Sequence, residues 1–94
     1  MAGEEGAEVA EAVAVSVRPN PVASSGEVRV TVPEAGHVRV ALYDVLGREV
    51  AVLADGVTEA GFYEATVGEG LPPGTYLLRF TTGGASHTVV VVKR

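Results

Sequence analysis

Valine recurs at every second position in two stretches of this 94-residue chain, and this period constrains the fold more than any other feature. In a β-strand, successive side chains point to opposite faces, so each stretch predicts a strand that buries one face. No apolar spacing of three or four extends beyond the first dozen residues, which argues against long helices. The first stretch contains Val13, Val15 and Val17, and the second contains Val28, Val30 and Val32.

The segment Pro19-Asn20-Pro21 separates these two stretches. Proline has no amide hydrogen to donate to a neighbouring strand, and it disfavours the helical conformation in the residue before it. We therefore expect strand pairing to stop here and the chain to bend. A strand that bends in this way can pass from one sheet to another, which favours a β-sandwich over a closed barrel, the rival arrangement.

Five further alternating segments follow, and each is bounded by residues typical of turns. The pattern predicts an all-β chain, a seven-stranded antiparallel immunoglobulin-like β-sandwich over residues 12–94. Residues 1–11 hold four glutamates and little to bury, so we expect them to form a disordered acidic linker. The turns are expected at Pro33 to Gly36, around Gly47, at Asp55-Gly56, at Ala60-Gly61, over Leu71 to Gly74 and at Gly83-Gly84. The inward-facing residues are expected to include Val38, Val40, Leu42, Tyr43, Tyr63, Ala65, Val67, Tyr76, Leu78 and Phe80.

Charge and cysteine content exclude several classes of function. The formal net charge is -5, and no basic stripe or polybasic run is present, so we expect no nucleic-acid partner. No apolar stretch approaches the ~20 residues of a spanning helix, so we expect no membrane insertion. The absence of cysteine rules out disulfides and thiolate metal sites.

No group of residues has the pattern of a catalytic or metal site. The serines have no helix with which to form a nucleophile elbow, and His37 and His87 lack the spacing of zinc ligands. The candidate acid–base residues fall on predicted turns or outer faces, where solvated charge is the better interpretation. We therefore expect neither enzymatic activity nor a cofactor. These candidates are Asp44, Asp55, Glu64 and Glu69.

Two features allow alternative interpretations. Exposure of Phe62 or Tyr63 would allow a ring to stack on a sugar, which keeps a carbohydrate-binding or adhesive module as an alternative function. The run Val89 to Val92 is apolar on both faces. It is either a terminal strand whose outer side is covered, with Lys93 and Arg94 limiting aggregation, or an edge to which a receptor adds a strand.

Five motifs in order resemble the C-terminal sorting domain of type IX secretion cargo, type A. They are Arg18-Pro19-Asn20-Pro21, the segment Val32 to Val38, the segment Tyr43-Asp44-Val45-Leu46-Gly47-Arg48-Glu49-Val50, the segment Leu71-Pro72-Pro73-Gly74-Thr75-Tyr76, and the basic end Lys93-Arg94. The resemblance covers residues 12–94. An immunoglobulin-like domain of the kind found in the flagellar hook-capping protein shares similar turns and is the main relative to exclude.

The resemblance implies a non-catalytic module that directs an N-terminal passenger domain to an outer-membrane type IX translocon. It further implies a sortase-like peptidase as a partner and a location outside the cell or on its surface, reached through the periplasm. The residues it assigns to the sorting motif are Pro19, Asn20, Pro21, Tyr43, Asp44, Gly47, Arg48, Gly74, Tyr76, Lys93 and Arg94. We expect most of them to hold the fold: Asn20 by bonding nearby backbone, and Asp44 by bonding amides of the Gly47 turn with Tyr43 beneath it.

Overall fold

The computed structural model describes residues 13–94, which form seven strands and no helix. The predicted linker, residues 1–11, lies outside the described residues. Because residues 13–94 contain no helix, no helical membrane span exists among them. The strands are β1 (Ala14–Arg18), β2 (Gly26–Val32), β3 (Gly36–Asp44), β4 (Glu49–Thr58), β5 (Gly61–Val67), β6 (Gly74–Thr82) and β7 (Ala85–Lys93).

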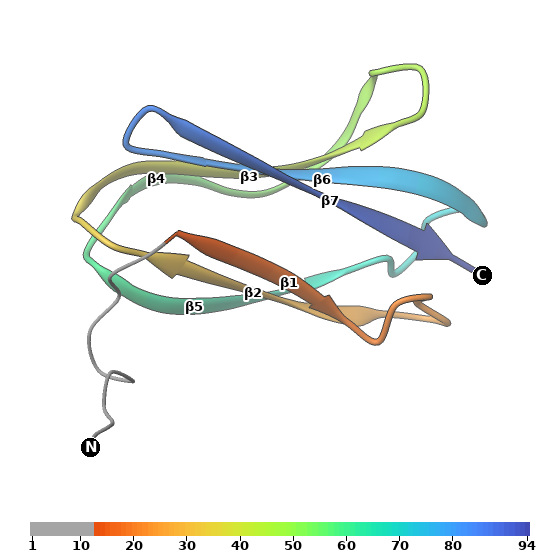
Figure 1. Ribbon diagram of the computed structural model, residues 1–94. Helices are drawn as coiled ribbons and strands as arrows, with labels where there is room; N and C mark the ends of the chain where they lie inside the picture. The colour runs from red at the N-terminus through yellow and green to blue at the C-terminus, as the bar shows by residue number, and fades with distance from the viewer. Residues whose placement is uncertain (1–12) are drawn as a thin grey trace.

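The strands form two antiparallel sheets that face each other, as Figure 1 shows. One sheet has the order β1-β2-β5 and the other the order β4-β3-β6-β7. The predicted seven-stranded sandwich is therefore confirmed. Its core is built by the alternating apolar residues of both sheets, and the largest fully buried side chains are Phe80, Leu42, Leu78, Val22, Val28, Val32 and Val91.

The proline segment interrupts strand pairing between β1 and β2, two neighbours of the three-stranded sheet. β1 pairs with β2 as far as Arg18, and both prolines follow cis peptide bonds. Val22 then forms a parallel bridge with Lys93 at the end of β7, in the opposite sheet. The expected interruption at residues 19–21 is confirmed. The expected passage to the other sheet is limited to this isolated bridge, because the chain returns to β2, which pairs with β1 in the same sheet.

The predicted turn at Asp55-Gly56 is wrong, because both residues lie inside β4. Asp55 is paired with Arg39 and Gly56 with Val38 on the neighbouring strand. The Asp55 carboxylate contacts His37 and Arg39 across the pair, so its charge is satisfied within the sheet. A turn-like dipeptide is tolerated here because cross-strand ion pairs stabilise the ladder.

Tyr43 does not enter the core. It lies on the outer face of β3, half-buried, and its hydroxyl accepts a hydrogen bond from Arg39 at 3.1 Å. The inward positions of β3 belong to Val38, Val40 and Leu42, as predicted. Tyr43 is one residue beyond this set, so the strand period places it on the opposite face.

Candidate functional site

The eleven residues assigned to the sorting motif gather at one end of the sandwich, whereas the segment Val32 to Val38 forms the turn between β2 and β3 at the other end. The turn after β3, the loop before β6, the end of β7 and the segment after β1 lie together there, around the C-terminus (Figure 1). The strand register ties these segments together, because Asp44 pairs with Tyr76, Gly74 pairs with Lys93 and Val22 bridges Lys93. We call this region the motif end. It is opposite the end at which β1 begins.

Asn20 binds the edge of β7 with its side chain. Its Nδ2 donates to the Val90 carbonyl at 2.7 Å, and its Oδ1 accepts from the Val92 amide at 3.0 Å. The backbone continues this pairing, because the Val22 amide donates to Val92 and the Arg94 amide donates to Val22. The primary amide of asparagine thus replaces the peptide group that a proline-flanked segment cannot supply. The expected backbone bond exists, but its partners are 70 and 72 residues away rather than local.

Replacing Asn20 by leucine is expected to lower the free energy of unfolding by about 1–2 kcal/mol, because two hydrogen bonds are lost at a partly hydrated edge. Urea unfolding would give the size of the effect. Hydrogen exchange of the Val92 amide should become faster, since that amide loses its acceptor. Ser24→Leu, in the same exposed loop, is the control. Unchanged exchange at Val92 would show that Asn20 does not close this edge.

Val22 anchors the segment between β1 and β2 in the core. It is fully buried, and its two methyl groups point at Gly26 and Gly68. A Cβ built on Gly68 would be 2.8 Å from Val22 Cγ1, so only glycine fits there without movement. Lys93 Nζ donates to the Leu71 carbonyl at 2.9 Å and so links the last strand to the loop before β6. Sequence reasoning missed both Val22 and Gly68, because nothing local indicates that they touch.

Asp44 organises the turn between β3 and β4. Its Oδ1 accepts from the amides of Leu46 and Arg48, both at 2.9 Å, and its Oδ2 accepts from Arg48 Nε at 2.8 Å. The hydrogen bond from the Arg48 amide, with those from the Arg48 side chain and the Leu46 amide, lowers the pKa of Asp44 despite the opposing effect of burial. The predicted role of Asp44 in this turn is confirmed.

The lowered pKa of Asp44 predicts a pH dependence of stability. A group whose pKa is lower in the folded state stabilises the fold above its unfolded pKa, and this contribution is lost as the pH falls through the folded value. We expect the difference in unfolding free energy between the wild type and Asp44→Asn to shrink below about pH 4, the ordinary range of aspartate. Thermal unfolding at several pH values would measure it. A constant difference would contradict this assignment.

Gly47 allows the same turn to close, because its φ is +84°, in a region that β-branched residues avoid. Gly47→Val is expected to cost about 1–3 kcal/mol from backbone strain alone, because no atom lies within 4 Å of a Cβ built there. Gly47→Asn should cost less, since asparagine tolerates positive φ. Equal melting temperatures of the valine variant and the wild type would contradict the strain argument.

Tyr76 and Gly74 build the loop on the other side of the motif end. Tyr76 is buried in the core, as predicted, and its hydroxyl donates to the Pro72 carbonyl at 2.6 Å. This bond ties the loop of residues 71–74 to the start of β6. Between the turn and the loop lies an open groove of about 660 Å³. Two apolar side chains of the turn, Val45 and Leu46, are 70% and 74% exposed beside it.

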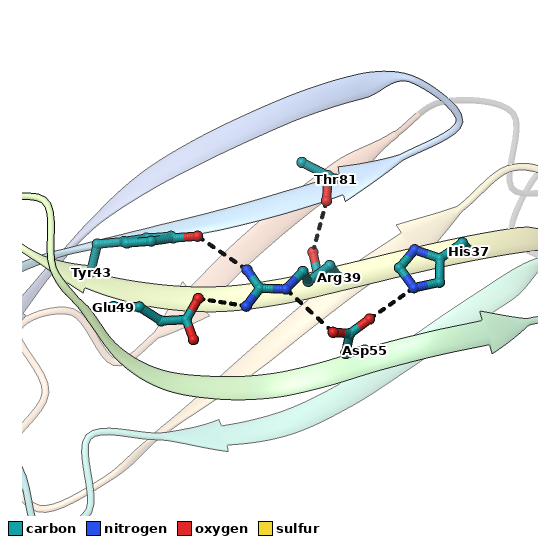
Figure 2. Close-up of polar contacts among 6 residues, drawn as sticks. All are labelled: His37, Arg39, Tyr43, Glu49, Asp55 and Thr81. Atoms are coloured by element: carbon teal, nitrogen blue, oxygen red, sulfur yellow. Dashed lines mark hydrogen bonds and ion pairs between the residues drawn. The ribbon is translucent and has the colours of Figure 1, made fainter.

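A polar network covers the outer face of β3 and β4, as Figure 2 shows. Arg39 donates to Tyr43, Glu49 and Asp55, and His37 contacts the second Asp55 oxygen at 2.8 Å. The hydrogen bonds from Arg39 to Glu49 and Tyr43 raise the pKa of Arg39. The sequence analysis did not predict this network. It places Asp55 in a turn, whereas Asp55 lies opposite Arg39 on the neighbouring strand.

The remaining chemical candidates lie apart from one another. No three histidine, aspartate or glutamate side chains in residues 13–94 could hold a metal ion together. Glu64 pairs with Arg29 at 2.7 Å on the outside of the three-stranded sheet. Phe62 is 51% exposed, but Tyr63 turns to the other face of β5 and donates its hydroxyl to the Glu59 carbonyl. The two rings therefore do not form one flat platform for a sugar.

A comparison with protein-family models gives one match, to the family described as secretion system C-terminal sorting domain, over residues 16–94. A search of curated proteins found no match. The matched region includes all seven strands except the first two residues of β1, and it includes every residue of the motif end.

Proposed function

The chain belongs to the family of secretion system C-terminal sorting domains, the sorting signals of type IX secretion, and we propose that the outer-membrane translocon recognises it at the motif end. Membership makes the protein a secreted or cell-surface one in which the domain accompanies a larger passenger. It favours the sorting function over the carbohydrate-binding alternative. The family is non-catalytic in general, and we propose that this chain also has no enzymatic activity of its own.

The observation that carries the proposal is the convergence of the motif residues at one end. Four of the five motifs meet there, although they lie as far as 72 residues apart in the chain. The fifth motif, Val32 to Val38, forms the turn between β2 and β3 at the opposite end. Their side chains form hydrogen bonds within this end of the domain: Asn20 bonds the backbone of β7, and Asp44 bonds the backbone of its own turn. These residues give the end a fixed shape. A receptor that recognises a folded domain requires a preorganised surface of this kind, and it does not require reactive side chains.

The finer assignments follow from this proposal. Residues 12–94 act as the sorting unit and residues 1–11 as the acidic linker to the passenger. A sortase-like peptidase is the second partner, and it removes the domain when cargo is attached to the cell surface. The exposed turn residues Val45 and Leu46 are the parts of the motif end best placed for direct contact, because they lie in the turn that Asp44 organises and contribute nothing to the core.

The direct test fuses the full chain behind a signal peptide and a fluorescent or enzymatic reporter in a host with a working type IX system. We expect the reporter in the medium or on the cell surface, and in the periplasm when the system is inactivated genetically. Mass spectrometry of the exported reporter would show whether the domain is removed. Retention of the reporter in the periplasm of the competent host would refute the proposed function.

A further inference from the structure

The outer face of the four-stranded sheet carries a band of exposed apolar side chains that runs across all four strands. Leu77 lies directly between Tyr43 on β3 and Val90 on β7, and Val92 is the next outward residue along β7. Val52 on β4 lies opposite Ala41, one outward position from Tyr43. We call these residues the outer apolar stripe. Val52, Leu77, Val90 and Val92 are 45%, 36%, 51% and 38% exposed, and Tyr43 is half-buried.

The stripe is unusual for the solvent side of an antiparallel sheet, which normally carries polar residues. The outer face of the other sheet follows that rule, because Arg29 there pairs with Glu27 and Glu64. The fold does not need apolar groups in the stripe, since the core is filled from the opposite face of the same strands. A contiguous exposed apolar patch on a small domain indicates a binding surface.

Arg79 gives the stripe a charge preference. It is an outward residue of β6, two positions from Leu77, and its Nε donates to Ser86 Oγ at 2.8 Å. None of the ion pairs among residues 13–94 includes Arg79, whereas Arg39 on the same face is matched by Glu49 and Asp55. An apolar surface beside an uncompensated guanidinium fits a partner that presents apolar side chains next to a carboxylate.

The size of the stripe distinguishes between kinds of partner. With strands ~4.8 Å apart and a rise of ~3.4 Å per residue, its four strands and three rows cover roughly 300 Å². A stable complex, including a lasting dimer of two copies, buries about 800 Å² per partner. The stripe is therefore suited to a transient complex. A sorting domain that is bound and then released requires a complex of this kind.

We propose that the outer apolar stripe, with Arg79 at its border, is a docking surface for a protein component of the secretion machinery that carries an acidic group within an apolar contact. This inference rests on the proposed sorting function. It extends recognition from the motif end along the outer face of β6 and β7. Because the stripe is exposed and does not build the core, its side chains can be changed without loss of the fold.

The experiment uses the full chain fused to the exported reporter and compares single variants. Leu77→Glu, Val90→Glu and Arg79→Glu are each expected to reduce the exported fraction about tenfold, which corresponds to a loss of about 1.4 kcal/mol of binding free energy. Arg79→Lys should keep most of the export, since the charge remains. Phe62→Glu is the matched control, because Phe62 is as exposed as Val90 but lies on the other sheet. Circular dichroism and melting temperatures of the purified variants would confirm that all are folded.

The outcomes separate the two proposals. If the wild-type fusion is not exported, the sorting function itself fails. If the wild type is exported and the folded stripe variants are exported equally well, the sorting function stands and the docking surface is refuted. Light scattering of the purified domain tests whether a second copy of the domain covers the stripe instead. A wild-type dimer that becomes monomeric with Leu77→Glu would make the stripe a contact between copies and would overturn the inference.

Discussion

Replacing Phe80 by alanine is expected to lower the free energy of unfolding by about 3–5 kcal/mol, the largest effect of any single change considered for this domain. Phe80 is fully buried on β6, opposite Val40 on β3 and His87 on β7, so it fills the centre of the core between the sheets. Truncation removes its contacts and leaves a cavity that the surrounding strands cannot close. Small domains have only about 5–15 kcal/mol of stability, so the variant should be close to unfolding at 37 °C.

Urea unfolding followed by circular dichroism would measure this loss. Leu77→Ala is the matched control, because Leu77 lies on the same strand with its side chain on the outer face. Its loss should be below about 1 kcal/mol, as is usual for surface positions. A similar loss for both variants would mean that the two faces of β6 are not inside and outside as described.

The two-residue period made the sandwich predictable. It assigned the inward valines of β2 and β3 and the inward Tyr76, Leu78 and Phe80 of β6 directly from the sequence, because one sheet face must be buried. The proline pair likewise predicted the end of strand pairing after Arg18, since proline cannot continue a ladder. Both arguments are local, and they succeed because each depends on the backbone of only a few residues.

The errors arose where partners from distant strands decide the structure. Asp55-Gly56 has the composition of a turn, but cross-strand pairing with Arg39 and Val38 keeps it inside β4. Tyr43 was assigned to the core as an aromatic residue, although its position in the period of β3 points it outward, where Arg39 donates to its hydroxyl. In both cases strand pairing, and not residue type, determines where the side chain lies.

The site was predictable as a set of residues but not as a mechanism. The resemblance to a sorting domain indicated Asn20 and Asp44, and the turn bonds of Asp44 follow from short-range turn chemistry. The partners of Asn20 on β7 could not be predicted, because only the folded topology brings them together. The same is true of the contact between Val22 and Gly68, which join the first and third turns of the motif end without any pattern in the sequence.

Gly68→Ala is expected to destabilise the domain by about 2–5 kcal/mol, through two effects that act at the same atom. Gly68 has a φ of +100°, where a Cβ costs about 1–2 kcal/mol, and the added Cβ would also lie 2.8 Å from Val22 Cγ1, an overlap worth about 1–3 kcal/mol.

Gly47→Ala, with a φ of +84° and nothing within 4 Å, isolates the first effect. The double variant Val22→Ala/Gly68→Ala isolates the second, because it removes the methyl groups that the new Cβ would strike. Urea unfolding of the wild type, Gly68→Ala, Gly47→Ala, Val22→Ala and the double variant should therefore show a lower stability for Gly68→Ala than for Gly47→Ala. The double variant should lose less than the sum of the losses of Val22→Ala and Gly68→Ala. Additive losses would show that Val22 does not pack against Gly68.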